Sequence, residues 1–249
     1  MNVAKYTHFE PIEIGPKTRV FVLTGAGISQ ESGIATFRDA NGLWEKHRFE
    51  DVASPEGWAK DDALVWRFYS ERRNQTATCE ANAAHRALGD LEAKIGAHLF
   101  LCTQNVDDLH EKGGSKHVVH MHGELFSSRC EDDRCALGKP HVDRNAYLTR
   151  GEIPKCRCGK RLRPHICWFG EMPFEMERIA AALDQSDVFV TIGSSGAVYP
   201  AAGFVRHARA LGHVRTIYVG PEEPDNAREF DECRLGKATE VVPTLFRVV

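Results

Sequence analysis

Short runs of apolar and β-branched residues recur along the chain and predict buried parallel strands. The expected strands are Thr18 to Thr24, His98 to Thr103, His117 to Met121, Val188 to Ile192, Val214 to Val219 and a short final run from Thr239 to Val242. Helical patterns lie between several of them, at Ala83 to Ile95 and at Pro173 to Leu183, and another helix is expected to open near Ile28. Alternating strands and helices favour an α/β fold with a parallel sheet covered on both faces.

Two stretches depart from this rhythm and are interpreted as insertions. Trp44 to Thr78 shows no strand pattern but contains a helix between Asp61 and Thr78, and Ser127 to Arg163 is polar, rich in Cys, Arg and Gly, and aperiodic. Together they are expected to form a smaller lobe, and a cleft between lobes commonly holds a ligand. The predicted organisation is a single domain over 1–249, with an α/β part at about 1–43, 79–126 and 164–249, a helical insertion at about 44–78 and a cysteine-rich module at about 127–163.

Charge and hydropathy narrow the possible partners. The chain has 32 basic and 35 acidic residues, a net charge of −3, which gives no support for nucleic-acid or membrane binding. The first residues lack the basic flank and apolar core of a secretory signal, and no apolar run is long enough to span a bilayer. We therefore expect a cytoplasmic protein. A monomer is the expected state, which none of these features determines.

Eight cysteines are present, and without a secretory signal a disulfide framework is not expected. Two scattered ones, Cys102 and Cys167, lie in apolar runs and are interpreted as small buried hydrophobic residues. Four others cluster in two close pairs, a pattern that suits a tetrahedral structural Zn²⁺ with no open coordination position. Metal binding would supply folding energy to a polar segment, whereas free thiols or a redox pair are the alternatives. The four are Cys130, Cys135, Cys156 and Cys158.

A glycine-containing turn follows the first predicted strand, from Gly25 to Gly33 with the sequence GAGISQESG. Such a turn allows the backbone to approach a pyrophosphate closely, but it lacks the G-x-G-x-x-G spacing. A tight turn without a ligand explains the segment equally well. Arg38 follows closely and either pairs with a phosphate or lies on the surface.

Polar residues also follow two later strands. Gln104, Asn105 and Asp107 come directly after an apolar strand, where they can bind a ribose or a carboxamide; helix capping is the alternative for the aspartate. His120 and His122 follow the next strand and are candidates for a general base near neutral pH. Their positions alone do not separate the two histidines.

The motifs GAGIS, GIATFR, TQNVD, HGEL, the paired cysteines, LRPHICWFGE and GSS, in this order, resemble those of the sirtuin family. The resemblance runs from about Val20 to Val242 and is nearest to the bacterial class III sirtuins. It implies a sirtuin-type catalytic domain, with a Rossmann-type part and a small lobe of zinc and helical modules. It places NAD on Gly25, Ala26, Gly27, Phe37, Arg38, Gln104, Asn105, Asp107, Gly193, Ser194 and Ser195.

The resemblance also implies a reaction, the removal of an acyl group from lysine with release of nicotinamide and O-acyl-ADP-ribose. It selects His122 as the base and gives Asn105 a catalytic role. The acyl-lysine peptide would lie as an extended strand between the lobes, which is strand addition. The substrate residues are Ala53, Tyr69, Arg72, Ile166, Trp168, Phe169 and Gly170.

Tyr69 and Arg72 are three residues apart on the predicted helix and share one face. In class III sirtuins such a pair recognises the acid end of succinyl- or malonyl-lysine, and Ala53 matches a small residue that leaves room for the chain. We therefore expect activity on both acetyl- and succinyl-lysine. The alternative is that the tyrosine packs in the core and the arginine is solvated.

The sequence departs from the family pattern after the fifth predicted strand. Val219-Gly220-Pro221 stands where the family has an Asn-containing stretch, so the adenine contact there must differ or use the backbone. Asp39 and Ala40 also replace more usual small residues. Two other functions stay open, an NAD-dependent ADP-ribosyltransferase and a non-catalytic NAD-sensing protein.

Overall fold

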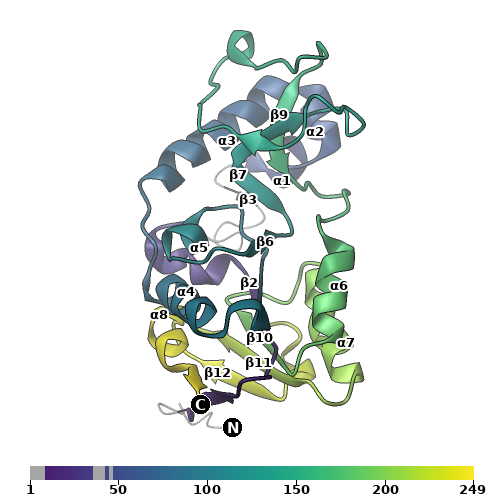
Figure 1. The fold of residues 1–249 in the computed structure, drawn as a ribbon. Helices are drawn as coiled ribbons and strands as arrows, with labels where there is room; N and C mark the ends of the chain where they lie inside the picture. Colours follow the sequence, from purple (N-terminus) through teal and green to yellow (C-terminus); the bar gives the residue numbers. More distant parts are fainter. Residues whose placement is uncertain (1–8, 36–42, 45–46) are drawn as a thin grey trace.

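The computed structural model describes residues 9–35, 43–44 and 47–249, and the side chains of 9–35 and 47–249. Figure 1 shows a large lobe built on a parallel sheet and a smaller lobe above it. Within the described residues, no helix is long and apolar enough to cross a membrane.

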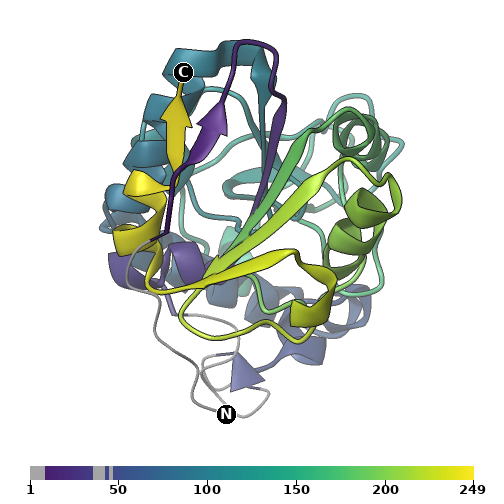
Figure 2. The same ribbon diagram turned by 90° about the horizontal axis from the view of Figure 1, so that it is seen from below.

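The large lobe is built on a six-stranded parallel sheet in the order β12-β11-β10-β2-β5-β6. All residues of β2 and β10 are buried, as expected for apolar strands covered on both faces. A separate parallel pair, β1 with β13, joins the two ends of the described chain (Figure 2). The strands are β1 (Ile12–Ile14), β2 (Val20–Thr24), β5 (Leu99–Thr103), β6 (Val118–His120), β10 (Val188–Ile192), β11 (Arg215–Gly220), β12 (Glu232–Leu235) and β13 (Phe246–Val248).

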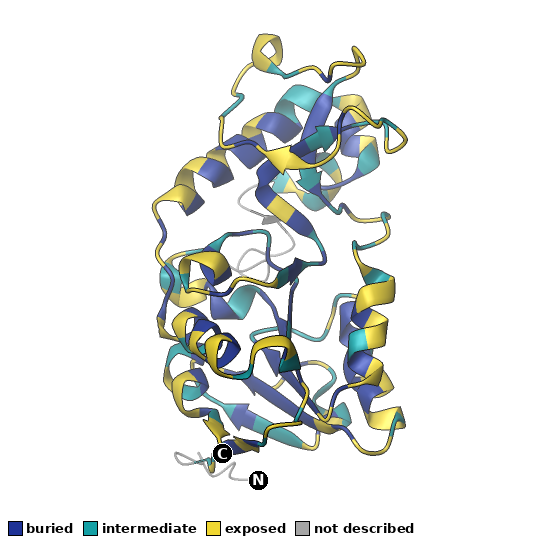
Figure 3. Cartoon of the chain, in the orientation of Figure 1, coloured by how far each residue is buried: buried dark blue, intermediate teal, exposed yellow. Residues whose placement is uncertain are grey.

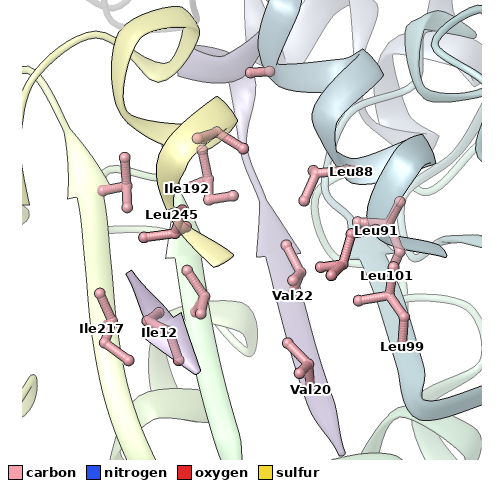
Figure 4. Close-up of a cluster of buried hydrophobic side chains, with 14 of the residues drawn as sticks. Ile12, Val20, Val22, Leu88, Leu91, Leu99, Leu101, Ile192, Ile217 and Leu245 are labelled. Carbon is pink, nitrogen blue, oxygen red and sulfur yellow. The ribbon is translucent and has the colours of Figure 1, made fainter. Parts of the chain in front are cut away.

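Helices cover the sheet on both sides (Figure 1). On one side lie α4 (Ala83–Ile95), α5 (Leu109–Lys112) and α8 (Ala238–Val241), and on the other α6 (Met176–Asp184) and α7 (Phe204–Ala210). Their inner faces are buried and their outer faces exposed (Figure 3). Figure 4 shows the first of these interfaces, where Leu88 and Leu91 of α4 meet Val20, Val22 and Leu101 of the sheet. A second cluster around Phe21 and Phe189 fills the opposite face.

The small lobe combines three helices with a three-stranded sheet in the order β8-β7-β9. Trp66 and Phe68 of the longest helix pack against Leu125 and Trp168, and the indole of Trp66 donates to Leu162 O at 3.0 Å. The lobe's elements are β3 (Leu43–Trp44), β4 (His47–Arg48), α1 (Phe49–Val52), α2 (Pro55–Lys60), α3 (Asp62–Ala77), β7 (Gly123–Cys130), β8 (His141–Val142) and β9 (Leu162–Ile166).

A buried arginine joins the helical and strand parts of the small lobe. The side chain of Arg73, on α3, is 1% exposed and forms an ion pair with Asp143 at 3.3 Å. It also donates to the carbonyl oxygens of Leu125, Asn145 and Ser127, at 2.7, 2.7 and 3.1 Å. One guanidinium therefore holds three carbonyls and a carboxylate that lie 52 to 72 residues further along the chain.

The expected parallel sheet and the helices of α3 and α4 are confirmed, but several local predictions are wrong. Thr239 to Val242 is helical, because Ala238 and Val242 share one buried face, and Pro243 lies in the first turn of the 3₁₀ helix Val242–Thr244 that follows α8. Near Ile28 the chain forms only two 3₁₀ turns, which end at Gly33 with φ +92°. The stretch after Trp44 carries the short β4, and the polar module contains the end of β7 and β8.

Candidate active site and metal site

The loops that follow β2 and β10 pack against each other at the carboxyl end of the sheet. Gly25 N donates to Ile192 O at 2.9 Å, and Gly27 N donates to Gly193 O at 2.8 Å. A Cβ on either Gly25 or Gly27 would lie 2.8 Å from the Gly193 oxygen. These glycines therefore permit close approach of two backbones, and Ala26 lies between them at the start of a 3₁₀ turn.

Three polar side chains meet beside this turn. The Asn105 amide donates to Ser29 Oγ at 3.1 Å, and that hydroxyl donates to Asp107 Oδ2 at 3.1 Å. Asp107 also accepts from Leu109 N at 3.1 Å, so it caps the following turn as well as facing the site. Burial raises the pKa of Asp107 from its ordinary value. The structure thus brings Asn105 and Asp107 together through a serine.

The two candidate histidines differ in their hydrogen bonds. His122 is half-buried, and its Nδ1 lies 3.0 Å from Gln104 O. Since a carbonyl only accepts, Nδ1 carries the hydrogen and Nε2 is the basic nitrogen. Burial lowers the pKa of His122, which keeps the ring neutral. The backbone oxygen of His122 also accepts from Cys167 N at 2.9 Å.

His120 is engaged at both ring nitrogens, with Asn105 O at 3.1 Å and Glu111 Oε1 at 2.9 Å. Although burial acts in the opposite direction, the hydrogen bond and charge of Glu111 raise the pKa of His120. An imidazole held between two acceptors is poorly suited to accept another proton. The geometry therefore favours His122 as a base.

Ser29 and His85 were missed by the sequence reasoning. His85 Nδ1 accepts from Asn82 N at 3.3 Å within the capping box of α4, which leaves Nε2 protonated and 3.4 Å from Ser29 Oγ. Burial lowers the pKa of His85 to about 4, so the ring is neutral. The available signal was Asn82 followed three residues later by His85 at the start of a strong helix.

Three other predicted cofactor residues, Gln104, Ser194 and Ser195, lie in the loops that follow β5 and β10. Gln104 Nε2 donates to Ser194 Oγ at 2.8 Å, which joins the loops after β5 and β10. Ser195 O accepts from Asp225 N at 2.9 Å, so the loop after β11 returns to this edge. Phe37, Arg38, Asp39 and Ala40 lie outside the described residues.

Two of the predicted acyl-recognition residues, Tyr69 and Ala53, contact the segment that carries the buried Trp168. Tyr69 is fully buried, and its hydroxyl accepts from Trp168 Nε1 at 3.1 Å. Phe169 N donates to Ala53 O at 3.0 Å, and the Phe169 side chain is exposed. The structure therefore brings Tyr69, Ala53 and the segment after β9 together.

Arg72 lies one turn after Phe68 on α3. Its guanidinium carbon is 3.6 Å from the centre of the Phe68 ring, and Nη1 donates to Phe68 O at 3.0 Å. Burial raises the pKa of Tyr69, and the charge of Arg72 acts on that phenol in the opposite direction. Ile166 is buried at the end of β9, and Gly170 has φ +89° in the turn that follows.

The four clustered cysteines converge although they come from distant segments. Their sulfur atoms all lie within 4.8 Å of one another, with Cys130–Cys158 and Cys135–Cys156 each at 3.7 Å. A tetrahedron of thiolates around zinc, with Zn–S of about 2.3 Å, has S···S edges of about 3.8 Å. A Cβ on Gly138 would lie 2.3 Å from the Cys130 Cβ, so the loop closes tightly on the cluster. The site fits Zn²⁺ with all four positions filled by protein.

Comparison with known proteins gives consistent matches. Residues 25–200 match the sequence profile of the Sir2 family. A curated NAD-dependent protein deacylase of Pasteurella multocida is 52% identical over 235 residues, which is 91% of this chain and 96% of that protein. The crystal structure of a Sir2 homologue–NAD complex has a TM-score of 0.81 at 37% identity, over 92% and 89% of the two chains. A mutant Sir2 homologue in complex with 2′-O-acetyl ADP-ribose has a TM-score of 0.81 at 36% identity, over 91% and 90%.

Proposed function

The chain belongs to the Sir2 family, and we propose that it is an NAD-dependent protein deacylase acting on acyl-lysine. The observation that carries the proposal is the meeting of Asn105, Asp107 and His122 at the carboxyl ends of β5 and β6. Ligands bind at this edge in open parallel sheets. Bound NAD supplies the ribose hydroxyl that receives the acyl group when nicotinamide leaves.

The side chains of the site have separate roles in NAD binding and in proton transfer. Asn105 and Asp107, tied together by Ser29, hold the ribose and carboxamide, and the tight turn at Gly25–Gly27 places backbone beside the pyrophosphate. Gln104 O accepts a hydrogen bond from Nδ1 of His122 and so keeps the hydrogen on that nitrogen. Nε2 is therefore free to take a proton. Burial lowers the pKa of His122, which favours the unprotonated ring before that step.

The Zn²⁺ site has a structural role in this proposal. Four cysteines fill the tetrahedral shell, so no position is left for water or substrate. The cluster joins the end of β7 to the segment before β9, and β9 leads directly into the peptide-binding residues at Trp168. The metal therefore stabilises the strand that carries the substrate segment.

The acyl preference that we propose includes acetyl groups and the acidic succinyl and malonyl groups. Tyr69 and Arg72 offer a phenol and a guanidinium, which together suit a carboxylate. Arg72→Met is expected to lower kcat/KM for a succinyl peptide by at least tenfold while changing the acetyl reaction less. The matched control is Arg67→Met, an exposed arginine on the same helix. Equal loss on both substrates would argue against recognition of the acid by Arg72.

The test of the activity itself follows acetyl- and succinyl-lysine peptides by mass spectrometry in the presence and absence of NAD. Wild-type protein should remove acyl groups only with NAD, and His122→Tyr should not. His117→Tyr, at a nearby side chain that is 78% exposed, serves as the control and should keep the activity. A peptide that gains ADP-ribose and keeps its acyl group would replace the proposal by the transferase function.

A further inference from the structure

A buried arginine, Arg163, forms an ion pair with the half-buried Glu171 beside the proposed peptide-binding segment. Arg163 is on β9, and its side chain is only 6% exposed. Its terminal nitrogens donate to the two carboxylate oxygens of Glu171 at 2.6 and 2.9 Å, and Nη2 also donates to Ile166 O at 2.9 Å. This bidentate geometry depends on the planar guanidinium, which lysine cannot reproduce.

The same pair fixes both the backbone and the ring of Trp168. Glu171 Oε2 accepts from Trp168 N at 2.8 Å, and Glu171 N donates to Trp168 O at 3.0 Å. The guanidinium carbon of Arg163 stacks 3.3 Å from the centre of the indole ring. A change at Arg163 must therefore move or loosen Trp168.

Trp168 in turn determines the position of the phenol in the acyl site. Its indole nitrogen donates to the Tyr69 hydroxyl at 3.1 Å, and Tyr69 has no exposed surface. A continuous chain of contacts thus leads from Arg163 through Glu171 and Trp168 to Tyr69. Arg163 does not contact Tyr69 through any of these bonds; it stacks on the indole of Trp168, which holds the Tyr69 hydroxyl.

We propose that Arg163 is a positioning residue for acidic acyl groups, because its contacts with Glu171 and Trp168 set the place of the Tyr69 hydroxyl. The inference rests on the proposed deacylase function. An acetyl group carries no carboxylate for Tyr69 to bind. Loosening of this chain therefore reduces succinyl-lysine recognition more than acetyl-lysine recognition.

The experiment compares Arg163→Lys with Arg129→Lys. Arg129 is the cross-strand partner of Arg163 on β7 and approaches the same Glu171 at 3.8 Å, but its guanidinium lies over Phe174. In Arg163→Lys the ratio of kcat/KM for succinyl and acetyl peptides is expected to fall about tenfold, mainly through KM for the succinyl peptide. KM for NAD should not change, and Arg129→Lys should keep the wild-type ratio.

A ratio unchanged in Arg163→Lys overturns the inference, as does an equal fall in both variants. If Arg163→Lys does not fold, Glu171→Gln replaces it, since it weakens the ion pair at nearly constant volume, and the same loss of ratio is required. A wild type that deacetylates without desuccinylating leaves the deacylase proposal standing and refutes the role of Arg163.

If the wild type acts on neither peptide, the proposed function fails separately. Calorimetric binding of the succinyl peptide then decides the role of Arg163. Binding must weaken more in Arg163→Lys than in Arg129→Lys, and equal or absent binding refutes that role.

Discussion

Replacing Arg73 with methionine is expected to lower the free energy of unfolding by about 3–5 kcal/mol. The substitution keeps most of the aliphatic volume but removes the partner of Asp143, whose side chain is 6% exposed. It also leaves the carbonyls of Leu125, Asn145 and Ser127 without their donor in a buried position. Removing one member of a buried pair has this large cost because the other charge stays desolvated.

The assay is urea unfolding followed by circular dichroism. With a slope of about 3 kcal/mol per molar, the midpoint should fall by about 1 M or more. Arg67→Met on the exposed face of the same helix should shift stability by less than about 0.5 kcal/mol. Adding Asp143→Asn to Arg73→Met should recover part of the loss, because the orphaned charge is removed. The reasoning is refuted if Arg73→Met and Arg67→Met unfold at the same midpoint.

Three further outcomes follow from the site geometry. Cys158→Ser should lose zinc to a chelator at a concentration that leaves the wild type loaded, as measured by atomic emission. Cys233→Ser, which lies outside the cluster, should keep one zinc per chain, and equal zinc retention in the two variants would exclude the metal site. Because burial lowers the pKa of His122, its neutral form persists to lower pH, so the acidic limb of kcat/KM for deacylation should have its midpoint below 6.5; a midpoint at or above this value contradicts His122 as the base. Gly27→Ala places a methyl group 2.8 Å from the backbone of the loop after β10, so it should lower the free energy of unfolding by about 1–3 kcal/mol in thermal unfolding. Gly151→Ala has open space around the new methyl group and should leave the free energy of unfolding unchanged.

Five of the six strands of the central sheet could be predicted because they read as apolar runs, whereas β12 (Glu232–Leu235) was missed because it carries Glu232 and Arg234 and has no apolar run. β10 was predicted with its observed bounds, Val188–Ile192. β1 and β13 were missed because they are three residues long and carry exposed polar residues, Glu13 and Arg247. Such short segments acquire their structure from pairing across the whole chain, which no local pattern reveals.

The site residues at the ends of β5 and β6 could also be predicted from the sequence, for a physical reason. Carboxyl ends of parallel strands meet at one edge, so Asn105 and His122 could be expected to converge. The hydrogen bond between His85 and Ser29 joins residues 56 positions apart and depends on how α4 packs on the sheet. The sequence alone therefore could not predict it. The Arg163–Glu171 pair was likewise hidden, because it depends on the turn at Gly170.

His122 stands where the chain passes from one lobe into the other. Its ring is held by the large lobe through Gln104 O, and its backbone oxygen accepts a hydrogen bond from Cys167 N, directly after β9. β7 begins with the next residue and leads into the small lobe. The proposed base is therefore tied by one hydrogen bond of its ring and one of its backbone to segments on either side of this passage. A movement of one lobe against the other would have to keep or break these two hydrogen bonds, so the position of the imidazole is coupled to the arrangement of the lobes.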